Sequence, residues 1–116
     1  MKQNTPPSRG EIWVVELDRE RGAEAQAVHR ALVISVNELN HGAAGIVTVL
    51  PMSDEDQRIA THVKVPAGEA MLTKNGFVKC EEVRSVSIER LTKRIGAVKA
   101  ETLAAVLRNV GVLLGV

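Results

Sequence analysis

The chain has 116 residues, of which 45% are hydrophobic, so it is long enough for one core and too short for two domains of ordinary size. Its 15 Lys and Arg residues against 14 Asp and Glu give a net charge of +1, which excludes a global electrostatic attraction to nucleic acid or to an anionic membrane. The single cysteine, Cys80, excludes an internal disulfide. We find neither an apolar secretion signal nor an apolar run of about 18 residues, so we expect a cytoplasmic protein without membrane contact.

The first half of the chain predicts a polar arm followed by strands. Residues 1–9 are polar and contain proline, which indicates a flexible N-terminal arm, and residues 10–116 form the single domain. Runs rich in β-branched residues predict three short buried strands, at residues 11–17, 30–36 and 45–51. The segment 18–29 between the first two strands is long and poor in apolar residues. Loops of about 12 residues in compact domains are often functional, so this loop is a candidate for part of a site.

The second half predicts more short strands and then one helix. A strand is expected at residues 61–65, two strands within 71–87 around the hairpin-type dipeptide Asn75-Gly76, and a last one at 94–98. From Ala100 the apolar residues follow helical spacing, at Leu103, Val106, Leu107, Val110 and Leu114. Consecutive strands without intervening helices cannot form a βαβ sheet, so we predict a mainly β protein, a small β-barrel with a C-terminal α-helix.

Most familiar kinds of reactive site have no sequence signature in this chain. The three histidines lie on separate segments and Cys80 has no CxxC partner, so we expect no metal site. We find no phosphate-binding loop, dinucleotide fingerprint or nucleophile elbow, so we expect no cofactor. Trp13 and Phe77 are the only aromatic residues, which is few for base stacking. Trp13 lies within a predicted strand and is expected to pack in the core or at an interface.

Four residues remain as candidates for a shared site. His29 and Arg30 stand at the start of the second predicted strand, Glu24 lies in the long loop before it, and Ser53 follows the third strand. The simpler interpretation is a solvated edge charge for Arg30 and a turn hydroxyl for Ser53. Residue spacing alone leaves both interpretations open.

The same residues carry a resemblance to a known family. Four segments match its pattern in order: GEIW at 10–13, GAEAQAVHRALVIS at 22–35, VTVLPMS at 47–53 and EEVRSVS at 81–87. With them the chain resembles the MazF/PemK family of toxin endoribonucleases from bacterial type II toxin-antitoxin systems. The resemblance implies an SH3-like barrel that forms a homodimer and is neutralised by a cognate MazE-like antitoxin with an acidic, flexible tail. The C-terminal helix and the first strands could supply the dimer contact.

The resemblance also implies a reaction and its residues. Such enzymes cleave single-stranded RNA (messenger RNA in the family's mRNA interferases) at short sequences without a metal ion. The ribose 2′-hydroxyl attacks the neighbouring phosphate, which leaves a 2′,3′-cyclic phosphate and a 5′-hydroxyl. By position Arg30 is the principal catalytic residue, Ser53 stands in the place of the catalytic Thr, and Glu24 matches the loop glutamate. Arg has a pKa above about 12, so Arg30 is expected to stabilise transition-state charge, with Glu24 or His29 as the base.

RNA contacts are expected from Arg84, inside a matched segment, and from the loop residues Arg19, Arg21 and Arg58, whose simpler interpretation is solvated surface charge. The chain departs from the family pattern at three positions: Ala31 replaces Pro, Ser53 replaces Thr and Glu82 replaces Gln.

The sequence leaves two other functions open. One is a gyrase-poisoning toxin of the same fold, and the other is a catalytically silent member that binds RNA or an antitoxin.

Overall fold

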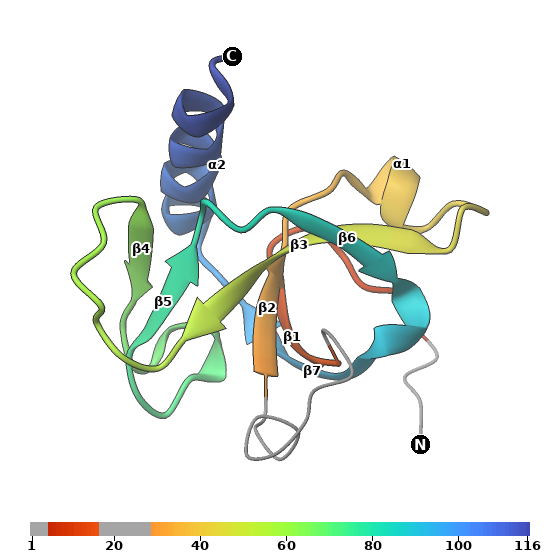
Figure 1. Ribbon diagram of the computed structural model, residues 1–116. Helices are drawn as coiled ribbons and strands as arrows, with labels where there is room; N and C mark the ends of the chain where they lie inside the picture. The colour runs from red at the N-terminus through yellow and green to blue at the C-terminus, as the bar shows by residue number, and fades with distance from the viewer. Residues whose placement is uncertain (1–4, 17–28) are drawn as a thin grey trace, which may run out of the picture.

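A computed structural model describes residues 5–16 and 29–116 (Figure 1). The chain forms a mainly antiparallel β structure followed by one long helix. In chain order its elements are β1 (Glu11–Val15), β2 (His29–Val33), α1 (Asn37–Asn40), β3 (Ile46–Ser53), β4 (His62–Val65), η2 (Glu69–Met71), β5 (Gly76–Lys79), β6 (Arg84–Ser87), η3 (Ile88–Arg90), β7 (Leu91–Ala97) and α2 (Ala100–Leu114).

The strands pair in the order β4-β5-β3-β2-β1-β7, and β6 also pairs with β3. All the strand pairs are antiparallel. The predicted mainly β fold with a C-terminal helix is therefore confirmed. Among the described residues the hydrogen-bonded pairings form a path from β4 to β7, and closure into a barrel stays a prediction.

Strand β3 is the longest described strand, and it pairs with β2, β5 and β6. Its first residues pair with β6, its middle with β2 and its last two, Met52 and Ser53, with β5. Alternating side chains of the strands fill two cores. The first core contains Ile12, Leu32, Ile34, Leu50, Val65, Ala70, Leu72, Val78, Cys80, Val106 and Val110. The second core contains Trp13, Val15, Ala31, Val33, Val47, Val49, Val86 and Leu91, so the prediction of a core Trp13 is confirmed.

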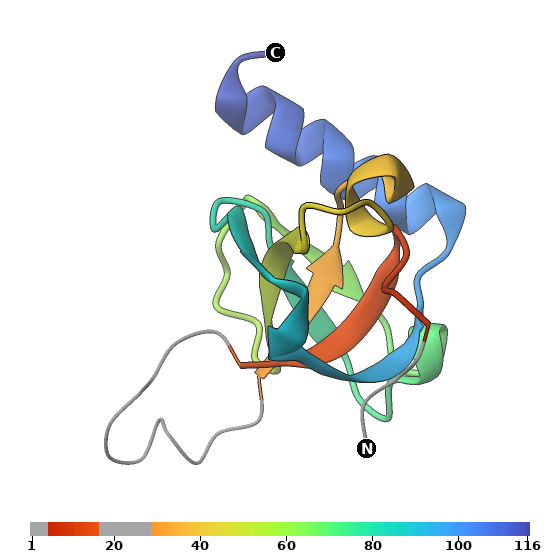
Figure 2. The same cartoon turned by 90° about the vertical axis from the view of Figure 1, so that its right-hand side faces the viewer.

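Helix α2 begins and ends where the sequence predicts. It covers the first core with Val106 and Val110, and Gly115 ends it with a φ of 75°. Leu114, part of the predicted apolar stripe, is 64% exposed instead of buried. The helix extends beyond the strands at its C-terminal end, which leaves its last turn uncovered (Figures 1 and 2). In the described part of the chain no helix is long and apolar enough to cross a membrane.

The predicted hairpin at Asn75-Gly76 is wrong. Gly76 opens β5, which pairs with β4 and β3, and residues 72–75 are not a strand. A Cβ on Gly76 would lie 2.7 Å from the Met52 side chain, so this glycine serves close packing. The Asn75 side chain accepts a hydrogen bond from the Ala67 backbone N–H and holds the preceding turn. The dipeptide Asn75-Gly76 therefore does not form a hairpin turn but packs against Met52 and bonds to Ala67.

The segment 69–75 packs closely against β7. A Cβ on Gly96 would lie 2.3 Å from the Ala70 carbonyl oxygen, so only glycine allows this approach. Ala70 and Met71 adopt φ angles of 55° and 62°, which non-glycine residues rarely adopt. The buried Glu69 carboxylate accepts the Lys99 backbone N–H at 2.9 Å. These contacts hold Glu69 and Ala70 between β7 and the start of α2.

Residues 7–9, which the sequence places in the N-terminal arm, lie against the sheet. Arg9 donates its Nε–H to the Ile34 carbonyl and its backbone N–H to the Asn37 side chain. Pro7 is buried, and its carbonyl oxygen lies 3.0 Å from His41 Nε2. This part of the predicted arm is therefore held in place by hydrogen bonds.

Candidate active site

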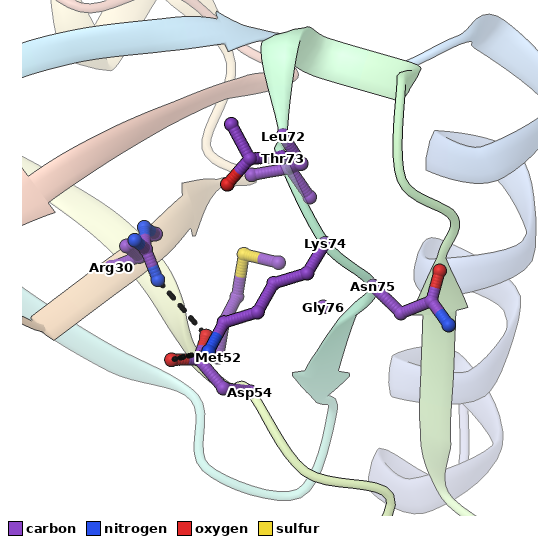
Figure 3. A pocket seen from close by; sticks show the side chains of 8 residues that line it. All are labelled: Arg30, Met52, Asp54, Leu72, Thr73, Lys74, Asn75 and Gly76. Carbon is purple, nitrogen blue, oxygen red and sulfur yellow. Dashed lines mark hydrogen bonds and ion pairs between the residues drawn. The ribbon is translucent and has the colours of Figure 1, made fainter.

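Arg30 lies at the centre of the best-defined cluster of polar side chains. It stands in β2 opposite Val14 of β1, and its side chain is 31% exposed. Its Nη1 donates to Asp54 Oδ1 at 2.9 Å, and Lys74 Nζ lies 3.7 Å from the other oxygen of the same carboxylate. Figure 3 shows Arg30 and Lys74 approaching Asp54 from different sides. Two cations thus share one carboxylate.

Two hollows meet at Arg30, and both include Leu72 and Thr73. The smaller, of about 20 Å³, is lined by Arg30, Met52, Asp54, Leu72, Thr73, Lys74, Asn75 and Gly76 (Figure 3). The larger, of about 310 Å³, is lined by Val14, Arg30, Met71, Leu72, Thr73, Lys93 and Ile95. Lys74 therefore stands on one side of Arg30 and Lys93 on the other. Such a row of cations beside an apolar wall can bind an anionic chain.

His29 and Arg30 do not face the same site. Consecutive residues of a strand point to opposite faces of the sheet. Leu32, on the face of Arg30, belongs to the first core, whereas Ala31 and Val33, on the face of His29, belong to the second. His29 lines neither hollow, and its buried Nε2 has no hydrogen-bond partner among the described residues. His29 and Arg30, neighbours in the sequence, thus lie on opposite faces of the sheet.

Ser53 is the last residue of β3, where sequence reasoning placed it just after the strand. Its hydroxyl donates to the Glu55 carbonyl oxygen at 3.0 Å and accepts the Glu55 backbone N–H at 3.0 Å. Among the described residues no hydrogen bond joins Ser53 to Arg30. The hydroxyl holds the turn that presents Asp54, which agrees with the simpler sequence interpretation of Ser53 as a turn hydroxyl.

The other predicted site residues are scattered or not described. Arg84 starts β6 opposite Val49 of β3, and it lines neither hollow. Arg58 lies in the exposed loop after β3, where its backbone N–H donates to Asp56. Glu24, Arg19 and Arg21 lie outside the described residues.

A second polar cluster lies between β4, β5 and α2. His62 Nε2 lies 2.9 Å from a Glu81 oxygen, and the Thr61 hydroxyl donates to the other. Burial alone would raise the pKa of Glu81, but the hydrogen bonds from Thr61 and His62 lower it below the ordinary value. Burial and then the Glu81 charge raise the pKa of the Cys80 thiol to about 11, so this thiol is unreactive near neutral pH. Over residues 5–16 and 29–116, no three His, Cys, Asp or Glu side chains group as metal ligands.

Sequence reasoning missed Asp54, Thr73, Lys74 and Lys93. Asp54 lies between two predicted strands and Lys74 lies in the predicted hairpin, where charged residues are ordinary. They meet only because β3 and β5 pair and segment 72–75 runs beside them. The one sequence signal that could have marked Asp54 is its position directly after the candidate Ser53.

The chain matches known toxins in sequence and in fold. Residues 8–114 match the family described as PemK-like, MazF-like toxin of type II toxin-antitoxin system. The chain is 36% identical over 101 residues to endoribonuclease MazF9 of Mycobacterium tuberculosis, covering 83% of this chain and 86% of that protein. A crystal structure of MazF from Deinococcus radiodurans superposes with a TM-score of 0.81 at 24% identity, covering 97% of this chain and 100% of that one.

A second solved structure shares the fold at lower identity. It is a mycobacterial endoribonuclease in complex with its cognate antitoxin, with a TM-score of 0.77, 19% identity and coverage of 95% of this chain and 96% of that one. The resemblance, which rests on the segments GEIW, GAEAQAVHRALVIS, VTVLPMS and EEVRSVS, is confirmed by the match over residues 8–114. This protein belongs to the PemK-like, MazF-like toxins of type II toxin-antitoxin systems.

Proposed function

We propose that this toxin is an endoribonuclease that cleaves single-stranded RNA and is neutralised by a cognate antitoxin. The observation that carries the proposal is the position of Arg30 at the meeting of two hollows, between Lys74 and Lys93, in a chain 36% identical to an endoribonuclease. A partly exposed guanidinium with five N–H donors is suited to bind a phosphate by two hydrogen bonds. RNA supplies phosphates at a regular spacing along such a row of cations.

The proposed reaction is an internal transesterification. The 2′-oxygen of one ribose forms a bond to the adjacent phosphorus while the bond from phosphorus to the 5′-oxygen breaks. A base accepts the 2′-hydroxyl proton and the leaving 5′-oxygen gains a proton, so the products are a 2′,3′-cyclic phosphate and a 5′-hydroxyl. Arg30 donates hydrogen bonds to the non-bridging oxygens, where negative charge increases in the transition state.

Of the two candidate bases, we assign the role to Glu24 and not to His29. The His29 side chain is directed to the second core, away from the Arg30 hollows, so it is poorly placed to accept a proton beside Arg30. The assignment of Glu24 as the base rests on the family pattern alone. Ser53 is proposed to hold a phosphate oxygen, for which its O–H must leave the Glu55 carbonyl.

The proposed function is tested with purified protein, a long single-stranded RNA, the same sequence as DNA, and excess chelator. We expect discrete cuts in the RNA alone, because only ribose carries the 2′-hydroxyl nucleophile. The fragments should carry a cyclic phosphate and a 5′-hydroxyl, identified by mass spectrometry. Intact RNA would contradict the proposal and leave the gyrase poison or the silent binder as the function.

A further inference from the structure

Among residues 5–16 and 29–116, Asp54 is the one carboxylate that lines the smaller hollow, and it contacts both Arg30 and Lys74. Its Oδ1 accepts from Arg30 at 2.9 Å and its Oδ2 lies 3.7 Å from Lys74 Nζ. A phosphate presents the same features: oxygens with shared negative charge, able to accept from a guanidinium and an ammonium at once. Asp54 therefore holds the position that an RNA phosphate would need.

The hollow is too small for both anions. Its free volume of about 20 Å³ admits little more than one water molecule. A phosphate could enter this hollow and contact both Arg30 and Lys74 only after the Asp54 side chain moves out. The side chain is 47% exposed and stands on the turn that Ser53 and Glu55 hold, so rotation toward solvent needs no change in the sheet.

We propose that Asp54 competes with RNA as an internal substitute for a substrate phosphate, and that Lys74 is a second phosphate ligand beside Arg30. RNA binding replaces the carboxylate on both cations. The inference rests on the proposed function, because it takes RNA as the ligand of Arg30. It adds a binding residue, Lys74, and an internal competitor, Asp54, that weakens the binding of RNA.

The energy of the competing contact is modest. Both ion pairs are partly exposed, and pairs of this kind contribute about 0.2–1 kcal/mol, which corresponds to a factor of roughly 1.4–5 in affinity. Asp54 therefore lowers affinity without preventing binding. A contact of this strength can be displaced by a polyanion that also meets Lys93 in the larger hollow.

The test compares Asp54→Asn with Glu55→Gln, which removes the same charge from the next residue of the loop. The probe is a fluorescein-labelled, mixed-sequence single-stranded RNA with 2′-O-methyl at every ribose, so binding is measured without cleavage. We expect Asp54→Asn to lower the Kd about 1.4- to fivefold at low salt. Glu55→Gln should leave the Kd within about 1.3-fold, as expected of a charge without a direct contact.

Lys74→Ala is compared with Lys64→Ala, an exposed lysine of β4 that lines neither hollow. We expect Lys74→Ala to weaken binding and to reduce the slope of log K against log salt by about 0.7, the value for one phosphate contact on a single strand. Lys64→Ala should leave the slope unchanged.

The outcomes separate this inference from the proposed function. An unchanged or higher Kd in Asp54→Asn, or a tenfold loss of kcat, would show that Asp54 orients Arg30 or takes part in the reaction, and would overturn the inference. Such a result with an RNA-cleaving wild-type protein leaves the proposed function intact. A wild-type protein that neither binds nor cuts RNA would overturn both.

Discussion

At the scale of single residues, Ser53 has two possible roles, a catalytic contact to phosphate and a local structural contact within its turn. Its hydroxyl is the donor to the Glu55 carbonyl, so a phosphate contact has to replace that bond. We expect Ser53→Ala to lower kcat about 100-fold to 1,000-fold, as for the loss of one donor to developing charge, and Ser53→Thr to retain activity. A loss of less than tenfold in Ser53→Ala, measured by RNA cleavage rates, would leave Ser53 with the turn alone.

The proposed base is tested by the pH dependence of cleavage. With Glu24 as base, Glu24→Gln should remove the acidic limb of the kcat profile and lower the rate about 100-fold or more. His29→Gln should retain that limb, because its side chain faces the second core. A profile that loses its acidic limb in His29→Gln alone would reverse the assignment.

The sequence predicted Arg30 but not its neighbours, for a physical reason. Arg30 is predictable because the segment 22–35 matches the family pattern and because Arg30 begins a predicted strand. The convergence of Asp54 and Lys74 depends on the pairing of β3 with β5 and on the path of segment 72–75. Neither is encoded in a local pattern. The sequence also placed His29 beside Arg30, where alternation in a strand separates them.

At the scale of elements, the contact between β7 and η2 shapes the wall of the larger hollow, which Met71 and Ile95 line. Gly96→Ala would force a Cβ to within 2.3 Å of the Ala70 carbonyl, so we expect it to lower the free energy of unfolding by about 1–3 kcal/mol. Gly111→Ala in α2 meets only ordinary contacts and should raise it by up to about 1 kcal/mol. Urea denaturation measures both, and equal effects of the two variants would contradict this account.

The Glu11 carboxylate, at the start of β1, accepts several hydrogen bonds and makes the stability of the fold depend on pH. Burial raises its pKa, but hydrogen bonds from Arg94, the Ser8 N–H and Trp13 outweigh this and lower the pKa below 4.5. A lowered folded pKa stabilises the protein above the unfolded value, and this stability is lost as pH falls from about 4.5 through the folded pKa. Glu11→Gln should therefore destabilise at pH 7 and reduce the acid-induced loss of the free energy of unfolding. Parallel stability curves for both proteins between pH 7 and 3 would argue against it.

The elements themselves were largely predictable. β-branched runs marked the strands and helical spacing marked α2, because each pattern reports which side chains are buried. Asn75-Gly76 misled because tertiary packing against Met52 and Ala67, and not turn formation, determines its role.

At the scale of the whole molecule, the exposed end of α2 bears on assembly. Val112, Leu114 and Val116 are 74%, 64% and 96% exposed, which is costly for apolar side chains in water. We predict a homodimer, with a mass by sedimentation equilibrium of twice 12.5 kDa. Leu114→Glu should shift the mass toward the monomer if this end lies in the interface. A monomer at every concentration would contradict the dimer.

The most direct test of the central claim is RNA cleavage by Arg30→Ala beside Arg58→Ala, which removes the same charge from an exposed loop outside both hollows. Both variants should fold, since Arg30 is partly exposed and Arg58 is exposed. We predict that Arg30→Ala loses cleavage by about 1,000-fold or more while Arg58→Ala stays within a few fold of wild type. A folded Arg30→Ala protein that cuts RNA at the wild-type rate would contradict the account.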